Sequence, residues 1–157
     1  MNILITGLAG CGKSTISKKL NKLGYISYDI ESIEGLFKMN KNEWVCDIKR
    51  LEYLIKTNLN ERLVFFCGMA SNFDKLISLF DVKLLLVTDE QTTLKRLRTR
   101  KKSSQYGHTE EVRQNLISWK SDWESRQLGK GLIKIDANKT VEEVVNYILE
   151  KTKSYSN

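Results

Sequence analysis

The sequence contains no proline, a single histidine and only three cysteines among its 157 residues. The cysteines (Cys11, Cys46 and Cys67) are odd in number and widely spaced, which excludes a disulfide framework or a zinc knuckle. No apolar run approaches the roughly 18 residues that a membrane-spanning helix needs. The N-terminal residues lack the basic flank and the long apolar stretch of a signal peptide, so we expect a cytoplasmic protein with no membrane partner.

The charge of the chain is unbalanced, with 26 Lys and Arg against 19 Asp and Glu and a net charge of +7. A basic balance admits nucleic acid, an anionic surface or phosphorylated small molecules as partners. Apolar residues make up 41% of the chain and charged residues 29%, which are values of a folded protein and exclude wholesale disorder. The length fits one compact domain spanning residues 1–157.

Five short apolar segments predict β-strands, and the stretches between them repeat apolar residues at the three- and four-residue spacing of helices. The predicted strands are Ile3–Thr6, Tyr25–Tyr28, Leu63–Cys67, Val82–Val87 and Leu132–Ile135. Continuously apolar strands are typical of parallel sheets that are covered on both faces. The alternation therefore predicts an α/β domain, whose ligand site lies beyond the carboxyl ends of the strands.

The segment Gly7-Leu8-Ala9-Gly10-Cys11-Gly12-Lys13-Ser14 fits the pattern G-x-x-x-x-G-K-[ST], which is a phosphate-binding loop. It follows the first predicted strand and opens a helical segment, which is the setting that the motif requires. Its glycines let backbone N–H groups surround an anion, Lys13 reaches the β- and γ-phosphates, and the Ser14 hydroxyl ligates Mg²⁺. Cys11 is interpreted as a small residue at a permissive position, with a thiol switch as the alternative. The predicted nucleotide-binding residues in this region are Gly7, Gly10, Cys11, Gly12, Lys13, Ser14 and Thr15.

A basic run follows the fourth predicted strand, where six of the eight residues from Lys95 to Lys102 are Lys or Arg. Arg96 and Arg100 are four residues apart and therefore share one face of a helix. A polar break at 103–107 precedes a new helical pattern near Glu110, so we predict a lid at about 98–112 that brings guanidinium groups to the transferred phosphoryl group. The alternative is a solvated basic face.

Two carboxylates stand near the end of the second predicted strand, Asp29 and, two residues later, Glu31. A carboxylate at this place lies beside the phosphate loop, so Asp29 is a candidate to hold Mg²⁺ through water or to act as base toward an acceptor hydroxyl. The alternative is that Asp29 or Ser32 begins a helix as its N-cap. Asp89 is interpreted as the N-cap of the helix that carries the basic run.

Taken together, the phosphate loop, the strand that ends in Asp29, the segment Cys67-Gly68-Met69-Ala70-Ser71-Asn72 and Arg96-x-x-x-Arg100 resemble small P-loop kinases. The resemblance is to the nucleoside-monophosphate kinase and shikimate kinase superfamily, particularly its small bacterial AAA-type or adenylate kinase-like members. It implies a three-layer α/β/α P-loop NTPase fold with a five-stranded parallel sheet of order 2-3-1-4-5. It also implies an acceptor-binding region at about 30–60 and a mobile lid.

The resemblance further implies that Arg96 packs on the nucleotide base, that Arg100 contacts phosphates and that the loop Asp136–Lys139 borders adenine. We accordingly expect Lys13, Arg96, Arg100 and Asp29 as catalytic residues and Ser14 and Asp29 as the metal site. The acceptor-binding candidates are Asp29, Arg50, Gly68 and Asn72.

Two departures from the family pattern concern the acceptor and the metal. The first arginine of the chain is Arg50, whereas nucleoside-monophosphate kinases hold the acceptor phosphate with an arginine before the third strand. In addition, Cys67-Gly68 stands at the end of the third strand, where many P-loop proteins have an aspartate. Asp29 then becomes the leading protein partner of the metal.

The sequence therefore predicts an ATP- and Mg²⁺-dependent kinase that transfers the γ-phosphoryl group to a nucleoside monophosphate or a similar small acceptor. One alternative is a nucleotide-binding regulatory or RNA-associated P-loop ATPase, which the basic run motivates and which makes nucleic acid the second choice of partner. Another alternative is a dephospho-coenzyme A kinase-like enzyme, which has the same reaction class and a different acceptor.

Overall fold

The centre of the molecule is a five-stranded, entirely parallel sheet. In the computed structural model, which describes residues 1–100 and 106–155, the strands lie in the order β2-β5-β1-β6-β7. Their bounds are β1 Asn2–Thr6, β2 Ile26–Asp29, β5 Val64–Cys67, β6 Val82–Val87 and β7 Ile133–Asp136. Numbered among themselves in chain order, these strands have the predicted order 2-3-1-4-5. The ends of each strand lie within one residue of the ends of its predicted segment.

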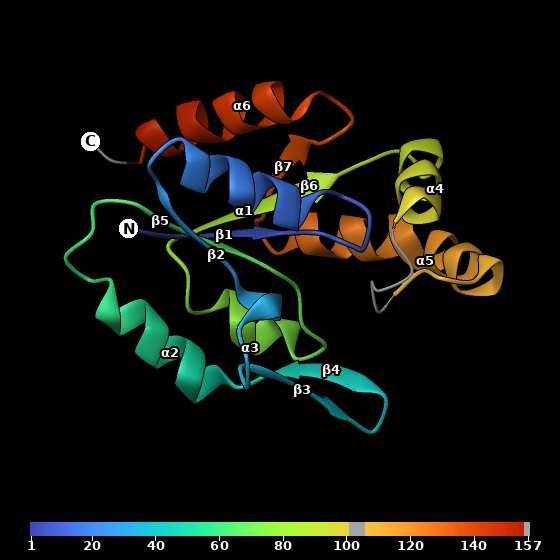
Figure 1. Ribbon diagram of the computed structural model, residues 1–157, viewed down its shortest axis with the longest axis horizontal. Coiled ribbons are helices and arrows are strands. Elements are labelled where there is room, and N and C mark those ends of the chain that lie inside the picture. The colour runs from blue at the N-terminus through green and yellow to red at the C-terminus, as the bar shows by residue number, and fades with distance from the viewer. Residues whose placement is uncertain (101–105, 156–157) are drawn as a thin grey trace.

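Helices cover both faces of this sheet (Figure 1). The helices α1 (Lys13–Lys22) and α6 (Val141–Lys153) pack on one face, where Ile16 and Val145 join Ile3 and Ile5 in a buried cluster. The helices α2 (Ile48–Thr57), α3 (Phe73–Ile77) and α5 (Glu110–Gly129) cover the other face. Because successive residues of a strand point to opposite faces, a strand buried on both sides must be apolar throughout, as the sequence predicts.

The helix starts follow from local capping. The side chain of Asp89 accepts a hydrogen bond from the Thr92 N–H at the start of α4 (Glu90–Thr99), so its predicted N-cap role is confirmed. Thr140 and Glu143 form the predicted capping box at the start of α6. Such caps satisfy backbone N–H groups that have no partner inside the helix.

An antiparallel hairpin, β3 (Phe37–Asn40) and β4 (Glu43–Cys46), lies between β2 and α2 and was not among the predicted strands. It is preceded by the short 3-10 helix η1 (Ile30–Ser32). Asn72 holds the end of the hairpin, since its Oδ1 accepts from the Cys46 N–H at 3.0 Å and its Nδ2 donates to the Cys46 carbonyl at 2.9 Å. Ser71 adds two bonds, from its N–H to the Trp44 carbonyl and from the Trp44 N–H to its Oγ.

Within the described ranges 1–100 and 106–155, none of the helices combines the length and the apolar character that crossing a membrane requires.

Candidate functional site

The phosphate loop, residues 7–14, connects the carboxyl end of β1 to the first turn of α1. A Cβ atom at Gly7 would lie only 2.7 Å from Cys11 Sγ and 2.7 Å from the Leu86 carbonyl oxygen, so no larger residue fits there. Gly12 has φ 103° and is the N-cap of α1, a left-handed conformation that favours glycine. These glycines let the loop turn tightly and present the N-terminus of α1, where an anion is stabilised by free N–H groups.

Lys13 extends back over this loop. Its Nζ donates a hydrogen bond to the Gly7 carbonyl at 2.7 Å and lies 3.7 Å from Glu31 Oε1. Ser14 and Thr15 are exposed on the first turn of α1. The cation and the hydroxyl groups predicted to meet phosphate and metal therefore lie together at one end of α1.

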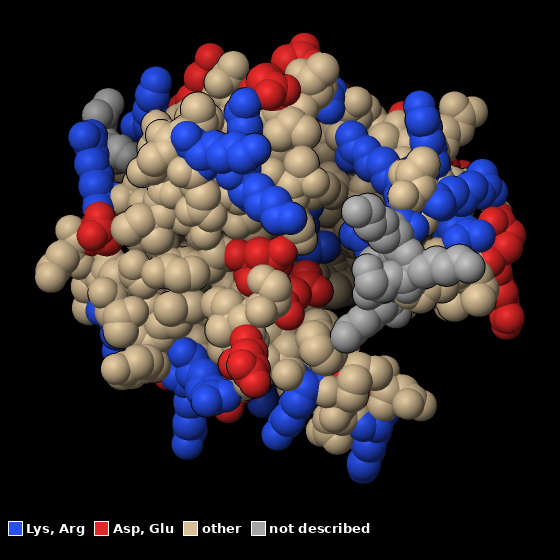
Figure 2. Space-filling view, in the orientation of Figure 1, with Lys and Arg blue, Asp and Glu red and all other residues tan. Residues whose placement is uncertain are grey.

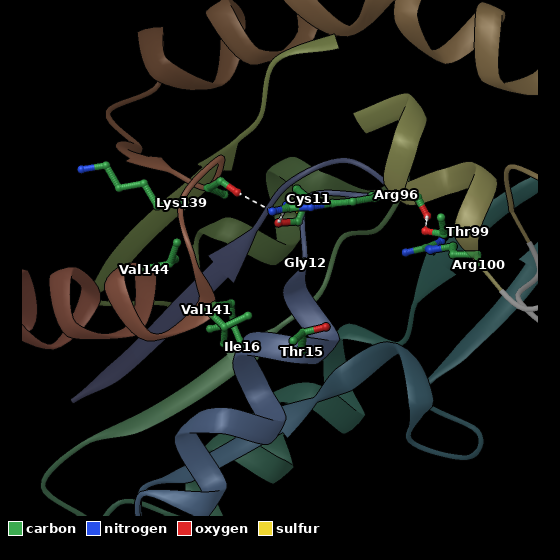
Figure 3. Close-up of a pocket in the computed structure, with 12 residues that line it drawn as sticks. Cys11, Gly12, Thr15, Ile16, Arg96, Thr99, Arg100, Lys139, Val141 and Val144 are labelled. Carbon is green, nitrogen blue, oxygen red and sulfur yellow. Dashed lines mark hydrogen bonds between the residues drawn. The ribbon is translucent and has the colours of Figure 1, made fainter. Parts of the chain in front are cut away.

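A cavity of about 320 Å³ lies beside the loop, between α4 and the loop that follows β7 (Figure 3). Arg96 links its walls, since Nη1 donates to the Cys11 carbonyl at 3.3 Å and Nη2 donates to the Ala137 carbonyl at 2.9 Å. Figure 3 shows the Arg96 side chain reaching from α4 toward Cys11, with Arg100 beside Thr99. Six predicted nucleotide-binding residues line the cavity: Gly10, Cys11, Gly12, Thr15, Arg96 and Arg100.

The opposite side of the cavity was not predicted in residue detail. It is apolar, because Val141 and Val144 at the start of α6 and Ile16 of α1 line it. An apolar wall facing a guanidinium group suits a flat aromatic ring, which stacks on both kinds of surface. The capping box places Val141 and Val144 in the first turn of α6, and their three-residue spacing was the signal available in the sequence.

Two carboxylates border the other side of the loop. Asp29 is the last residue of β2 and is aligned with Cys67 of β5. Asp29 occupies the N-cap position of η1, as the alternative from the sequence has it, but its side chain makes no capping hydrogen bond there. Glu31 accepts a hydrogen bond from the Met69 N–H at 3.0 Å while it faces Lys13. In Figure 2, acidic side chains gather over η1, below basic side chains that lie over α1.

The remaining acceptor candidates are not brought to one place. Gly68 lies against η1, where a Cβ atom would collide with the Ile30 side chain. The amide of Asn72 is occupied by the backbone of Cys46. Arg50 donates to the Gly35 carbonyl and lines a separate hollow of about 410 Å³, which shares no lining residue with the nucleotide cavity.

Comparisons with known proteins agree with this geometry. Residues 3–117 match the family described as AAA domain. A curated protein of Thermococcus kodakarensis named "Putative adenylate kinase" is 31% identical over 157 residues, covering 95% of this chain and 84% of the relative. The chain belongs to this family of small P-loop kinases.

Solved structures show the same fold. Deoxyadenosine kinase from M. mycoides with bound dATP superposes with a TM-score of 0.61 at 20% identity, covering 98% of this chain and all of that chain. Shikimate kinase from Acinetobacter baumannii in complex with shikimate has a TM-score of 0.63 at 18% identity, covering 98% and 93% of the two chains. At these identities the likeness establishes the fold of the kinase.

The cysteines of this P-loop kinase are buried. Burial raises the pKa of the Cys67 thiol to about 12 and that of the Cys46 thiol to about 12. Both thiols are therefore protonated at neutral pH and are poor nucleophiles. Cys11 is 4% exposed and packs beneath Gly7, in line with a small loop residue.

The predicted lid of the kinase lies partly outside the described residues, since 101–105 are not among them. Among the described residues next to the predicted lid, Glu110 forms an ion pair with Arg98 of α4 at 2.8 Å and another with Arg113 of α5 at 2.9 Å. Hydrogen bonds from Arg98, Gln114 and Arg113 lower the pKa of Glu110 to about 2. Glu110 therefore ties the end of α4 to the start of α5.

Proposed function

We propose that this kinase transfers the γ-phosphoryl group of ATP to a small-molecule acceptor. The observation that supports this best is the continuity between the phosphate loop and the cavity, which share Gly10, Cys11 and Gly12. A nucleotide whose phosphates occupy the loop has its base directed to this cavity. The deoxyadenosine kinase structure with dATP supports an adenine nucleotide as donor.

Each residue of the site has a role in this proposal. The loop N–H groups and Lys13 neutralise the β- and γ-phosphates, and Arg96 stacks against the base while keeping its bonds to the two loops. Arg100, which also lines the cavity, adds positive charge as the transfer proceeds. Catalysis then depends on positioning and charge neutralisation, which is what phosphoryl transfer requires.

Mg²⁺ fits the donor groups at the end of α1. Ser14 offers an exposed hydroxyl and Asp29 a carboxylate, and hard oxygen ligands are those that Mg²⁺ prefers. Among residues 1–100 and 106–155, no three His, Cys, Asp or Glu side chains cluster as a metal cage, which suits an ion that relies on nucleotide phosphates for most of its ligands. When bound, Mg²⁺ supplies charge neutralisation for the phosphates.

The names of the relatives point to different acceptors, with adenylate in one and deoxyadenosine or shikimate in others. A nucleoside monophosphate, or a similar small acceptor, remains the proposal from sequence. A dephospho-coenzyme A kinase-like reaction has the same chemistry and is tested by the same assay with another acceptor.

An RNA-associated role receives less support. It requires the basic run to form one extended face, but Arg96 lines the cavity and Arg98 pairs with Glu110. Titration with RNA at low and high salt tests it, and an affinity that is strong at low salt and falls steeply with salt would favour it over the kinase.

The nucleotide site is tested by measuring ATP affinity of Arg96→Ala by calorimetric titration. Arg96 lines the cavity and joins its two walls by charge-assisted bonds to the Cys11 and Ala137 carbonyls. Because its loss removes both the cavity wall and these bonds, we expect Arg96→Ala to bind ATP about tenfold more weakly. Lys95→Ala, an exposed residue of the same helix with the same charge change, is the matched control and should bind ATP like the wild type. Equal affinity of both variants would contradict the assignment of the cavity.

A further inference from the structure

We propose that Asn138 is a positioning residue of the nucleotide site, which holds the loop beside the base cavity in its binding shape before the nucleotide arrives. This loop, residues 136–139, leads from β7 to α6 and contributes Ala137 and Lys139 to the lining of the cavity. The inference rests on the proposed function, because it names how the same site is prepared for its nucleotide.

Asn138 joins two loops that are 49 residues apart in the sequence. Its side-chain oxygen accepts a hydrogen bond from the Asp89 N–H at 2.9 Å, and its side-chain amide donates to Asp136 Oδ1 at 2.8 Å. The backbone N–H of Asn138 donates to the same Oδ1 atom at 3.0 Å. One exposed side chain therefore fastens the loop after β7 to the residue at which α4 begins.

Asp89 is a firm anchor for this contact, because it is bonded to the first turn of α4 on both of its sides. Its Oδ1 atom accepts from the Thr92 N–H at 2.6 Å, and its carbonyl accepts from Thr93 Oγ1 at 2.8 Å. Thr93 is fully buried, and its hydroxyl also pairs with that of Thr88 at 2.8 Å. The contact with Asn138 therefore ties the loop after β7 to the start of α4.

The same loop is held again at the preceding residue. The Ala137 N–H donates to the Val87 carbonyl at 2.8 Å, and the Ala137 carbonyl accepts from Arg96 Nη2 at 2.9 Å. Arg96 lines the cavity and meets the base in the proposed complex. Among the described residues that line the cavity, Asn138 does not appear, so a bound nucleotide leaves its bonds in place. Asn138 thus acts on the base through the loop and not by contact.

A loop that is fixed in advance binds its ligand more tightly. Ordering a loose loop at the moment of binding costs conformational free energy, which lowers the affinity. The apparent dissociation constant rises in inverse proportion to the fraction of molecules whose loop has the binding shape. Loss of Asn138 should therefore weaken the binding of the base, while the phosphate loop, which follows β1, keeps its affinity for phosphates.

The first experiment compares ATP with inorganic tripolyphosphate, which has the phosphates without the base, by calorimetric titration. We expect Asn138→Ala to bind ATP about tenfold more weakly and to bind tripolyphosphate like the wild type. A purely structural role would lower both affinities or neither. The matched control is Asn146→Ala, because Asn146 is an exposed residue of α6 whose side chain makes no hydrogen bond within residues 1–100 and 106–155. It should bind both ligands like the wild type.

The second experiment exchanges the two side chains of the pair. Asn138→Asp keeps an acceptor for the Asp89 N–H but places a second carboxylate against that of Asp136, so we expect ATP binding to weaken by about tenfold. The double variant Asp136→Asn with Asn138→Asp again has one carboxylate and one amide, and its ATP affinity should return to within about twofold of the wild type. A double variant as weak as Asn138→Asp alone overturns the proposed role of this pair.

The outcomes separate this proposal from the proposed function. Equal ATP affinity of Asn138→Ala and the wild type overturns the role of Asn138 and leaves nucleotide binding intact. An equal loss of affinity for ATP and for tripolyphosphate also overturns it, because the effect is then not confined to the base. Failure of the wild type to bind ATP instead contradicts the proposed function, and the positioning role fails with it.

Discussion

Gly68 is a single residue whose missing side chain allows η1 to pack closely against the end of β5. Its missing side chain lets Ile30 and Glu31 pack against the end of β5, which places the Glu31 carboxylate between Met69 and Lys13. The sequence predicted Gly68 as an acceptor-binding residue, and that role stays a prediction. The structure adds that Gly68 positions a neighbour that touches the loop lysine.

We expect Gly68→Ala to destabilise the protein by about 1–3 kcal/mol, the usual cost of overpacking a tight contact. The physical reason is the collision of the new Cβ atom with the Ile30 side chain. Urea unfolding measures this change. Gly129→Ala is the matched control, because the space around Gly129 at the end of α5 is open and helix propensity favours alanine by about 0.5–1 kcal/mol. Equal stability of Gly68→Ala and the wild type would contradict the packing argument.

At the scale of elements, the hairpin of β3 and β4 was the hardest part to foresee. The hairpin turns through Lys41 and Asn42 with φ of 47° and 66°, without the Asn-Gly or Asp-Gly pair that marks such turns in a sequence. The exposed Lys38, Met39 and Asn40 also give no clear alternation. The five core strands, by contrast, were predicted because burial on both faces leaves a continuous apolar run.

The hairpin depends on Asn72, so we expect Asn72→Ala to destabilise the protein by about 2 kcal/mol by leaving the Cys46 N–H and carbonyl without their partner. Urea unfolding again provides the measurement. Ser71→Ala removes one bond at an exposed position and should cost less than about 1 kcal/mol. A larger loss for Ser71→Ala than for Asn72→Ala would show that the hairpin is held in another way.

The ion pairs of Glu110, which tie the end of α4 to the start of α5, predict a pH dependence of stability. The pKa of Glu110 falls from 4.5 to about 2 through its bonds to Arg98, Gln114 and Arg113, so its stabilising effect is present above pH 4.5 and is lost as pH falls through about 2. We therefore expect wild type to have a higher Tm than Glu110→Gln at pH 7 and the difference to vanish toward pH 2. Thermal unfolding at pH 7, 4.5 and 2.5 checks this, and a difference that grows with acid would contradict it.

On the scale of the whole molecule, the sheet order brings together residues that are far apart in the sequence. The phosphate loop after β1, the carboxylates after β2 and the Arg96 helix after β6 all lie along one edge of the sheet. Motif spacing was sufficient to predict the loop and the Arg96 helix, because these signals are local. The separation of Arg50 from the cavity depends on how η1 and α2 pack, which no local pattern specifies.

The central claim is that this arrangement transfers the γ-phosphoryl group of ATP by way of Lys13. The most direct measurement is ADP production from Mg-ATP by the wild type and by Lys13→Ala, with circular dichroism to confirm that the variant is folded. Because the Lys13 side chain is engaged only by loop carbonyls and Glu31 within the described residues, we expect an intact fold with turnover lower by about 100-fold or more. Wild-type turnover in a folded Lys13→Ala protein would contradict the claim.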